Sequence, residues 1–241
     1  MESLSTADFP TWLTVLSWVS LLLAIGIALW VVLDLRARPQ PMKVMNFVWP
    51  LTMLFGSVIW LWLYLRWGRA EPASSDAERP EKPFPASVAV GASHCGAGCS
   101  AGDIVAEFSV ALIPGLAAAL GLGTLYQTEV FAGWILGFVL AYLFGVVFQY
   151  FSIAPVQGLS FWPGIRAAIK ADTLSIISWQ IGMYGVMAIA QFVIFSRLYG
   201  APASPLTPEF WFAMQIAMLG GFATAYPMNW FLIRVGVKEA M

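Results

Sequence analysis

The side chains most able to do chemistry gather in one short segment. The only histidine, His94, and the only two cysteines, Cys95 and Cys99, fall within six positions, among four glycines. Asp103 and Glu107 follow them. From Cys95 onward these side chains repeat every fourth residue, so a helix would place them on one face. No other part of the sequence brings soft ligands, acids and flexible backbone together.

This segment fits a metal site. Thiolate and imidazole are ligands that Cu(I) and Zn(II) prefer. The spacing of Cys95 and Cys99 lets both sulfurs reach one ion, and the glycines let the backbone wrap around it. Asp103, or a group from another helix, would be a fourth ligand. We therefore expect His94, Cys95, Cys99 and Asp103 to hold a metal ion, copper or zinc.

Composition places this segment in a membrane protein. The chain has 241 residues, of which 60% are hydrophobic and 10% charged, whereas about a quarter of an ordinary soluble domain is charged. Several apolar runs reach roughly 20 residues, enough to cross a bilayer core of about 30 Å. We predict an all-α, polytopic transmembrane bundle of about six helices. No basic patch points to nucleic acid, and no phosphate-binding loop points to ATP.

The expected organisation has three parts. Residues 1–69 form an N-terminal transmembrane hairpin, 70–90 a polar linker rich in Pro, Ser and charge, and 91–241 a four-helix domain that carries the cysteine motif. Ser100 and Asp103 fit a capping box at the start of its first helix. The six helices are expected at about 11–33, 44–67, 101–122, 129–151, 160–195 and 209–235.

Further side chains along the bundle are candidates for an ion path beyond the cysteine segment. Glu107 lies a turn below Asp103, and acids at membrane depth are functional candidates because they are costly there. Met183 and Met187 are four apart on the fifth helix; thioethers bind Cu(I), although methionine also fills apolar cores. A small-residue face on the fourth helix predicts close approach of a neighbouring helix: Gly133, Gly137, Ala141 and Gly145.

Charge sets the expected orientation. Six spans would put both termini on one side. With cytoplasmic termini, the inner segments hold eight Lys and Arg residues and the outer segments four, which favours this orientation by the positive-inside rule. The first hairpin alone counts the other way. We expect a multi-pass protein of the cell inner membrane with cytoplasmic termini, in contact with the lipid bilayer, and leave a homo-oligomer open.

Short strings spread over most of the chain carry a resemblance. They are His94-Cys-Gly-Ala-Gly-Cys99 with Gly102-Asp-Ile104 and Glu107, Met45-Asn46 with Trp49-Pro50, Arg66-Trp-Gly-Arg69, Lys170-Ala-Asp-Thr-Leu-Ser175, Gly182-Met183 and Tyr226-Pro-Met-Asn-Trp230. Together they resemble a family of bacterial membrane proteins catalogued as a domain of unknown function, number 4396. The resemblance implies a multi-spanning membrane protein with this cysteine pattern. It implies no activity.

Three functions remain in view. The first is binding and transport of a soft or borderline metal ion, with copper(I) favoured, captured by the cysteine segment at the mouth of the bundle and passed along Glu107, Met183 and Met187. The second is an enzymatic thiol-disulfide or electron-transfer component using Cys95 and Cys99. The third is a non-catalytic assembly protein in which the small residues only permit tight packing.

Overall fold

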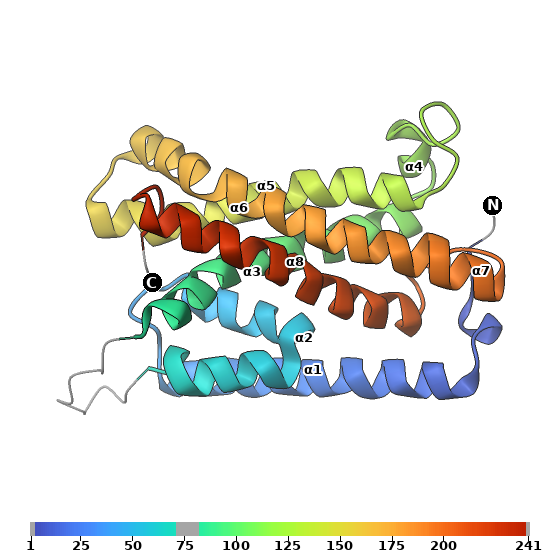
Figure 1. Ribbon diagram of the computed structural model, residues 1–241, viewed down its shortest axis with the longest axis horizontal. Coiled ribbons are helices and arrows are strands. Elements are labelled where there is room, and N and C mark those ends of the chain that lie inside the picture. The colour runs from blue at the N-terminus through green and yellow to red at the C-terminus, as the bar shows by residue number, and fades with distance from the viewer. Residues whose placement is uncertain (1–2, 71–81, 240–241) are drawn as a thin grey trace.

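Long helices form a bundle in the computed structural model, which describes residues 3–70 and 82–239 (Figure 1). Among these residues, six helical segments are long and apolar enough to cross a membrane. The prediction of an all-α transmembrane bundle of about six helices is therefore confirmed. The helices are α1 (Thr11–Ala37), α2 (Met45–Leu63, continued by a π-helix at Tyr64–Gly68), α3 (Phe84–Leu112), the short α4 (Leu116–Ala119), α5 (Val130–Gln157), α6 (Phe161–Ala188, continued by a π-helix at Ile189–Phe195 into α7, Ser196–Tyr199) and α8 (Pro208–Arg234).

The central helix, α3, starts earlier than expected. It begins at Phe84, with Pro85 in its first turn where a missing amide costs least. The last residues of the expected linker, 84–90, are therefore helical, and residues 71–81 of that linker lie outside the described residues. α3 packs on α2, α5, α6 and α8, so its side chains meet most of the bundle.

The second apolar run folds back on itself instead of crossing the bundle (Figure 1). Ser57 has φ 43° and ψ −123°, which breaks the helix in its middle. The rings of Trp49 and Tyr64 lie 5.3 Å apart between centroids; in a straight helix, 15 residues at about 1.5 Å each would separate them by about 22 Å. α2 is therefore a re-entrant hairpin with two antiparallel arms.

Contacts at both ends of this hairpin hold it in place. Arg69, just beyond its second arm, donates to the Asp34 carboxylate at 2.6 and 2.9 Å, and the Tyr64 hydroxyl donates to the same group at 2.7 Å. Asp34 lies near the end of α1, so the hairpin leaves the bundle where it entered. At the turn, Gln215 of α8 donates to the carbonyl oxygen of Leu54 at 2.7 Å, which satisfies backbone that the broken helix leaves open.

The two ends of the chain lie at opposite ends of the bundle (Figure 1). The backbone of Leu4 bonds to Pro202, before α8, whereas Gln157 at the end of α5 bonds to Glu239. The expectation that both termini share one side is wrong, because it counted residues 44–67 as a span.

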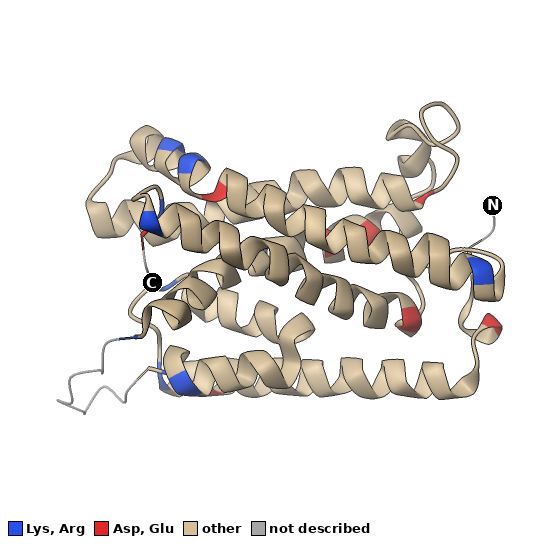
Figure 2. Cartoon of the chain, in the orientation of Figure 1, with Lys and Arg blue, Asp and Glu red and all other residues tan. Residues whose placement is uncertain are grey.

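Basic residues gather at the end of the bundle where α8 finishes (Figure 2). Of the chain's 12 Lys and Arg residues, Arg79 lies outside the described residues. Of the remaining eleven, ten lie in segments at this end, and Arg197 of α7 lies at the other. The expected count of eight against four changes because the hairpin brings Arg36, Arg38 and Lys43 to the same end as the other basic residues.

Candidate functional site

The cysteine segment lies inside α3, not ahead of a helix. His94, Cys95 and Cys99 are completely buried, so the expected position at the mouth of the bundle is wrong. The expected capping box is also wrong, because Ser100 lies mid-helix and donates its hydroxyl to the carbonyl oxygen of Gly96 at 2.9 Å. The small residues of this segment therefore serve helix packing; they do not let the backbone wrap around a metal ion.

Because α3 has glycines where it faces α5, the backbones of the two helices lie in direct contact. A Cβ on Gly98 would lie 2.8 Å from the amide nitrogen of Gly145, and one on Gly102 would lie 2.7 Å from the Cα of Ala141. Both distances are far below an ordinary contact. The small-residue face predicted for residues 133–145 is thus confirmed as a helix-helix interface, and its partner is the cysteine helix.

The side chains of Cys95, Cys99, Asp103 and Glu107 form a row along one face of α3. At the Cys95 end of this row lies a buried triad of charged and polar groups. The thiol of Cys95 donates to Asp172 Oδ1 of α6 at 2.9 Å. Lys238, which follows α8, reaches the same oxygen with its Nζ at 3.3 Å and the Cys95 sulfur at 3.6 Å. Burial would lower the pKa of Lys238, but its contacts with Cys95 and Asp172 outweigh burial and raise that pKa above its usual value.

The other end of the row carries two acids without a basic partner. Asp103 and Glu107 are 3% and 4% exposed, and among the described residues neither forms an ion pair. They lie against glycines of α5: a Cβ on Gly137 would lie 2.7 Å from Asp103 Oδ1, and one on Gly133 would lie 2.5 Å from Glu107 Oε2. The missing side chains of α5 therefore make the room that these carboxyl groups occupy.

Each acid also borders a cavity. Glu107 lines one of about 180 Å³ at the N-terminal end of the bundle, together with Thr128 and Glu129. Asp103 lines a larger cleft of about 440 Å³ between α1, the turn of α2, α3 and α8. From Cys95 to Glu107 the row runs about 18 Å, at about 1.5 Å per residue, which is more than half of a bilayer core.

The expected metal ligands do not converge. Within the part of the chain that the structure describes, no three His, Cys, Asp or Glu side chains form a group that could hold an ion. His94 and Cys95 are consecutive, and consecutive side chains on a helix point in different directions. Both ring nitrogens of His94 are buried and lack a hydrogen-bond partner among the described residues.

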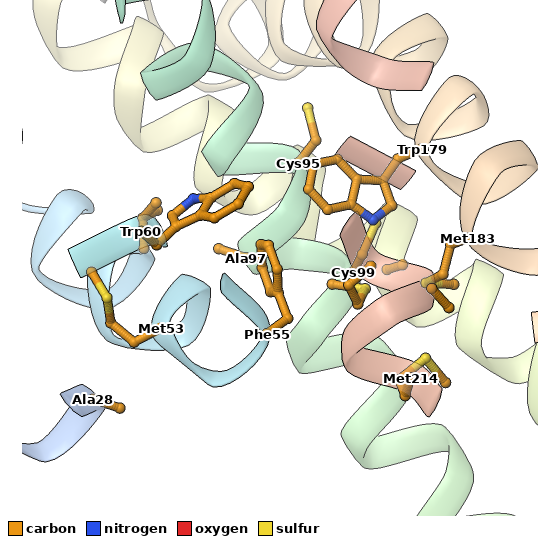
Figure 3. Close-up of a cluster of buried hydrophobic side chains, with 14 of the residues drawn as sticks. Ala28, Met53, Phe55, Trp60, Cys95, Ala97, Cys99, Trp179, Met183 and Met214 are labelled. Carbon is orange, nitrogen blue, oxygen red and sulfur yellow. The ribbon is translucent and has the colours of Figure 1, made fainter. Parts of the chain in front are cut away.

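Soft donors nevertheless share one apolar core. Cys99, Met183 and Met187 are fully buried in the same cluster, and Figure 3 shows Cys99, Met183 and Met214 among its side chains. The two methionines are therefore core residues, as their helical spacing allows. The rings of Phe55 and Trp179 pack edge to face in this core, 5.6 Å apart.

Sequence reasoning missed Asp172 and Lys238 as members of the site. Asp172 and Lys238 are 66 residues apart, and no spacing rule joins them. Asp172 carried a usable signal, because it is an acid inside an apolar run; Lys238 was counted only as a surface charge. Tyr184, which donates its hydroxyl to the Trp134 carbonyl oxygen at 2.8 Å, lies near Gly137 beside Asp103 and was also missed.

Comparison with family models matches residues 86–238 to the domain of unknown function DUF4396. The chain belongs to this family. The DUF4396 match begins inside α3 and ends at Lys238, so it contains every side chain of the buried row, whereas α1 and the α2 hairpin precede it. No curated protein and no solved structure matches the chain. The DUF4396 description names no activity, so the function must come from the geometry.

Proposed function

We propose that the protein is a proton-coupled cation transporter whose carrier groups are Asp103 and Glu107. One observation carries this proposal: two carboxyl groups are buried on one face of α3 with no basic partner among the described residues. An ionised side chain at the centre of a membrane costs about 2.5–3.5 kcal/mol on insertion scales. Buried acids without a basic partner do not stabilise the fold. The chemistry available to them is to bind and release a proton or a cation.

Access to the row differs at its two ends. Glu107 borders a cavity at the N-terminal end of the bundle. At the C-terminal end of the bundle, the side chains of Cys95, Asp172 and Lys238 are buried and bonded to one another. This arrangement supports a state in which the acids exchange with one side only. Opening to the other side would need Lys238 to leave Asp172.

The charge distribution supports an orientation. Ten of the eleven described Lys and Arg residues lie at the C-terminal end, and basic residues concentrate on the cytoplasmic side of membrane proteins. We infer that the C-terminus is cytoplasmic and the N-terminus lies outside, in the inner membrane. The cavity beside Glu107 then faces outward.

A soft metal ion is the second cargo to consider. Its support is the burial of Cys99, Met183 and Met187 in one core, because thiolate and thioether groups bind copper(I). The lack of a preformed ligand group among the described residues speaks against a stored copper or zinc ion and for an ion held only in transit. The redox alternative has less support, since Cys95 and Cys99 are inaccessible to a partner protein.

The test is flux through the purified protein in liposomes. With a potassium gradient and valinomycin, an internal pH dye should report proton uptake, and Asp103→Asn and Glu107→Gln should each lower the rate at least tenfold. Asp8→Asn, a matched change at an exposed acid, should leave the rate unchanged. Parallel uptake of copper(I) should fall in Cys99→Ser if the metal is cargo. A wild-type rate equal to that of empty liposomes in every arm would contradict the proposal, as would wild-type rates in both acid variants.

A further inference from the structure

The cleft beside Asp103 has the form of a ligand site. It lies between α1, the turn of α2, α3 and α8, and its volume of about 440 Å³ falls within the range of about 300–1,000 Å³ found for small-molecule sites. Its walls are almost wholly apolar. On the α1 side, Trp18 and Ile25 line it and are about half exposed, so the cleft opens toward lipid.

Asp103, which lines this cleft, carries a buried polar atom without a partner. Asp103 Oδ2 is buried and forms no hydrogen bond with any described residue. The other oxygen, Oδ1, lies on the side of Gly137. A buried polar group without a hydrogen bond is costly, and an ionised one needs a counter-charge. No described residue supplies that charge, so a ligand in the cleft is the available source.

The walls favour a particular kind of cation. Phe108 of α3 and Trp211 of α8 stack with their ring centroids 5.1 Å apart, and both line the cleft with Phe55 and Trp18. Aromatic faces attract cations, most strongly where water is excluded. A small hydrated metal ion would lose its water here without gaining ligands. A cation whose charge is surrounded by apolar groups matches both the walls and the acid.

We propose that this cleft binds a lipophilic organic cation, an ammonium or phosphonium ion with aromatic or alkyl substituents, and that Asp103 is its counter-ion. The ligand enters from the bilayer, places its apolar groups against the aromatic walls, and takes the place of the proton on Asp103. Binding requires no translocation. The use of this ligand as cargo rests on the proposed function, in which Asp103 releases its proton to one side.

Binding to the full chain in detergent tests the site without any gradient. Tetraphenylphosphonium is the probe in equilibrium dialysis, and triphenylphosphine oxide is its neutral counterpart. Wild-type protein should bind the cation at least tenfold more tightly than Asp103→Asn does, and acidification should release it. The neutral compound should not distinguish the two proteins. Asp8→Asn should bind both compounds as wild type does.

A second variant tests the cleft with Asp103 intact. Leu21 lines the cleft from α1, and Leu21→Trp should fill it and lower tetraphenylphosphonium binding at least tenfold, while Leu33→Trp on the lipid-facing surface of the same helix should not. Equal binding of the cation by wild type, Asp103→Asn and Leu21→Trp would overturn the proposal. Binding without proton flux would contradict the transport function alone; flux without binding would contradict the cleft alone.

Discussion

Lys238 Nζ lies 3.3 Å from Asp172 Oδ1, and both side chains are completely buried although Lys238 comes after the last residue of α8. The pair ties the C-terminal segment to α6, and the thiol of Cys95 joins it from α3. A buried ion pair is retained at a high desolvation cost. Its position at the closed end of the row makes it the gate that the proposed transport cycle would open.

Breaking this pair should destabilise the protein strongly. Lys238→Ala leaves Asp172 buried without a counter-charge, and removal of one partner of a buried pair costs about 3–5 kcal/mol. Thermal unfolding in detergent should show a clear fall in Tm. Lys170→Ala, at an exposed lysine of α6, is the matched control. The double variant Lys238→Met with Asp172→Leu should recover most of the loss, because it removes both charges; no recovery would show that the pair is not the cause.

The hairpin predicts which surface positions share a side of the membrane. In a background without native cysteines, Lys43→Cys and Glu239→Cys should be labelled by an impermeant maleimide from the same side. Ser3→Cys and Thr124→Cys should be labelled from the opposite side. All four positions are exposed. Six spans would instead put the two members of each pair on different sides, so labelling of Lys43→Cys and Glu239→Cys from opposite sides would exclude the hairpin.

Close approach of α3 and α5 predicts an unequal pair of glycine substitutions. Gly102→Ala would place a Cβ 2.7 Å from the Cα of Ala141, and overpacking of this kind costs about 1–3 kcal/mol. Gly185→Ala on α6 meets nothing within 4 Å and should be neutral or stabilising by up to about 1 kcal/mol, because Ala favours helix more than Gly does. Equal Tm values for the two variants would remove the claim of backbone contact.

Hydropathy was sufficient to predict the helical bundle, and the spacing of small residues was sufficient to predict the packing face of α5, because both depend on patterns local to one helix. It could not separate a span from a hairpin. The run from Met45 to Gly68 has the length and composition of a crossing helix, and only contacts such as Arg69 with Asp34, 35 residues away, show that it turns back. One signal was present in the sequence. The basic residues of the expected N-terminal transmembrane hairpin, residues 1–69, contradicted the positive-inside rule that the rest of the chain followed.

The site was harder to predict than the fold. The Gly, Ser and Cys residues around His94 have weak helix propensity, which suggested a flexible segment. Packing against α5 overrides that propensity and buries the segment as helix. The fourfold spacing from Cys95 to Glu107 correctly indicated one helical face, but the partner groups come from α6 and the C-terminal segment, where no sequence spacing points to them.

The two cysteines should stay reduced and unreactive in the folded protein. Residues four apart on a helix have Cβ atoms about 5–6 Å apart, whereas a disulfide needs about 3.5–4.5 Å, and both thiols are completely buried. Native protein treated with a mild oxidant should therefore form no Cys95–Cys99 bond, and maleimide should label neither thiol until the protein is unfolded in dodecyl sulfate.

The control for this experiment is Lys43→Cys, whose exposed position should be labelled in the native state under the same conditions. The alternative outcome has a definite meaning. Native labelling of Cys95 or Cys99, or a disulfide between them, would require α3 to unwind around this segment. That would return a thiol-disulfide function to first place, because a helix that opens here exposes the two groups the redox chemistry needs. Protection of both thiols together with proton flux lost in Asp103→Asn would instead assign the row to cation movement.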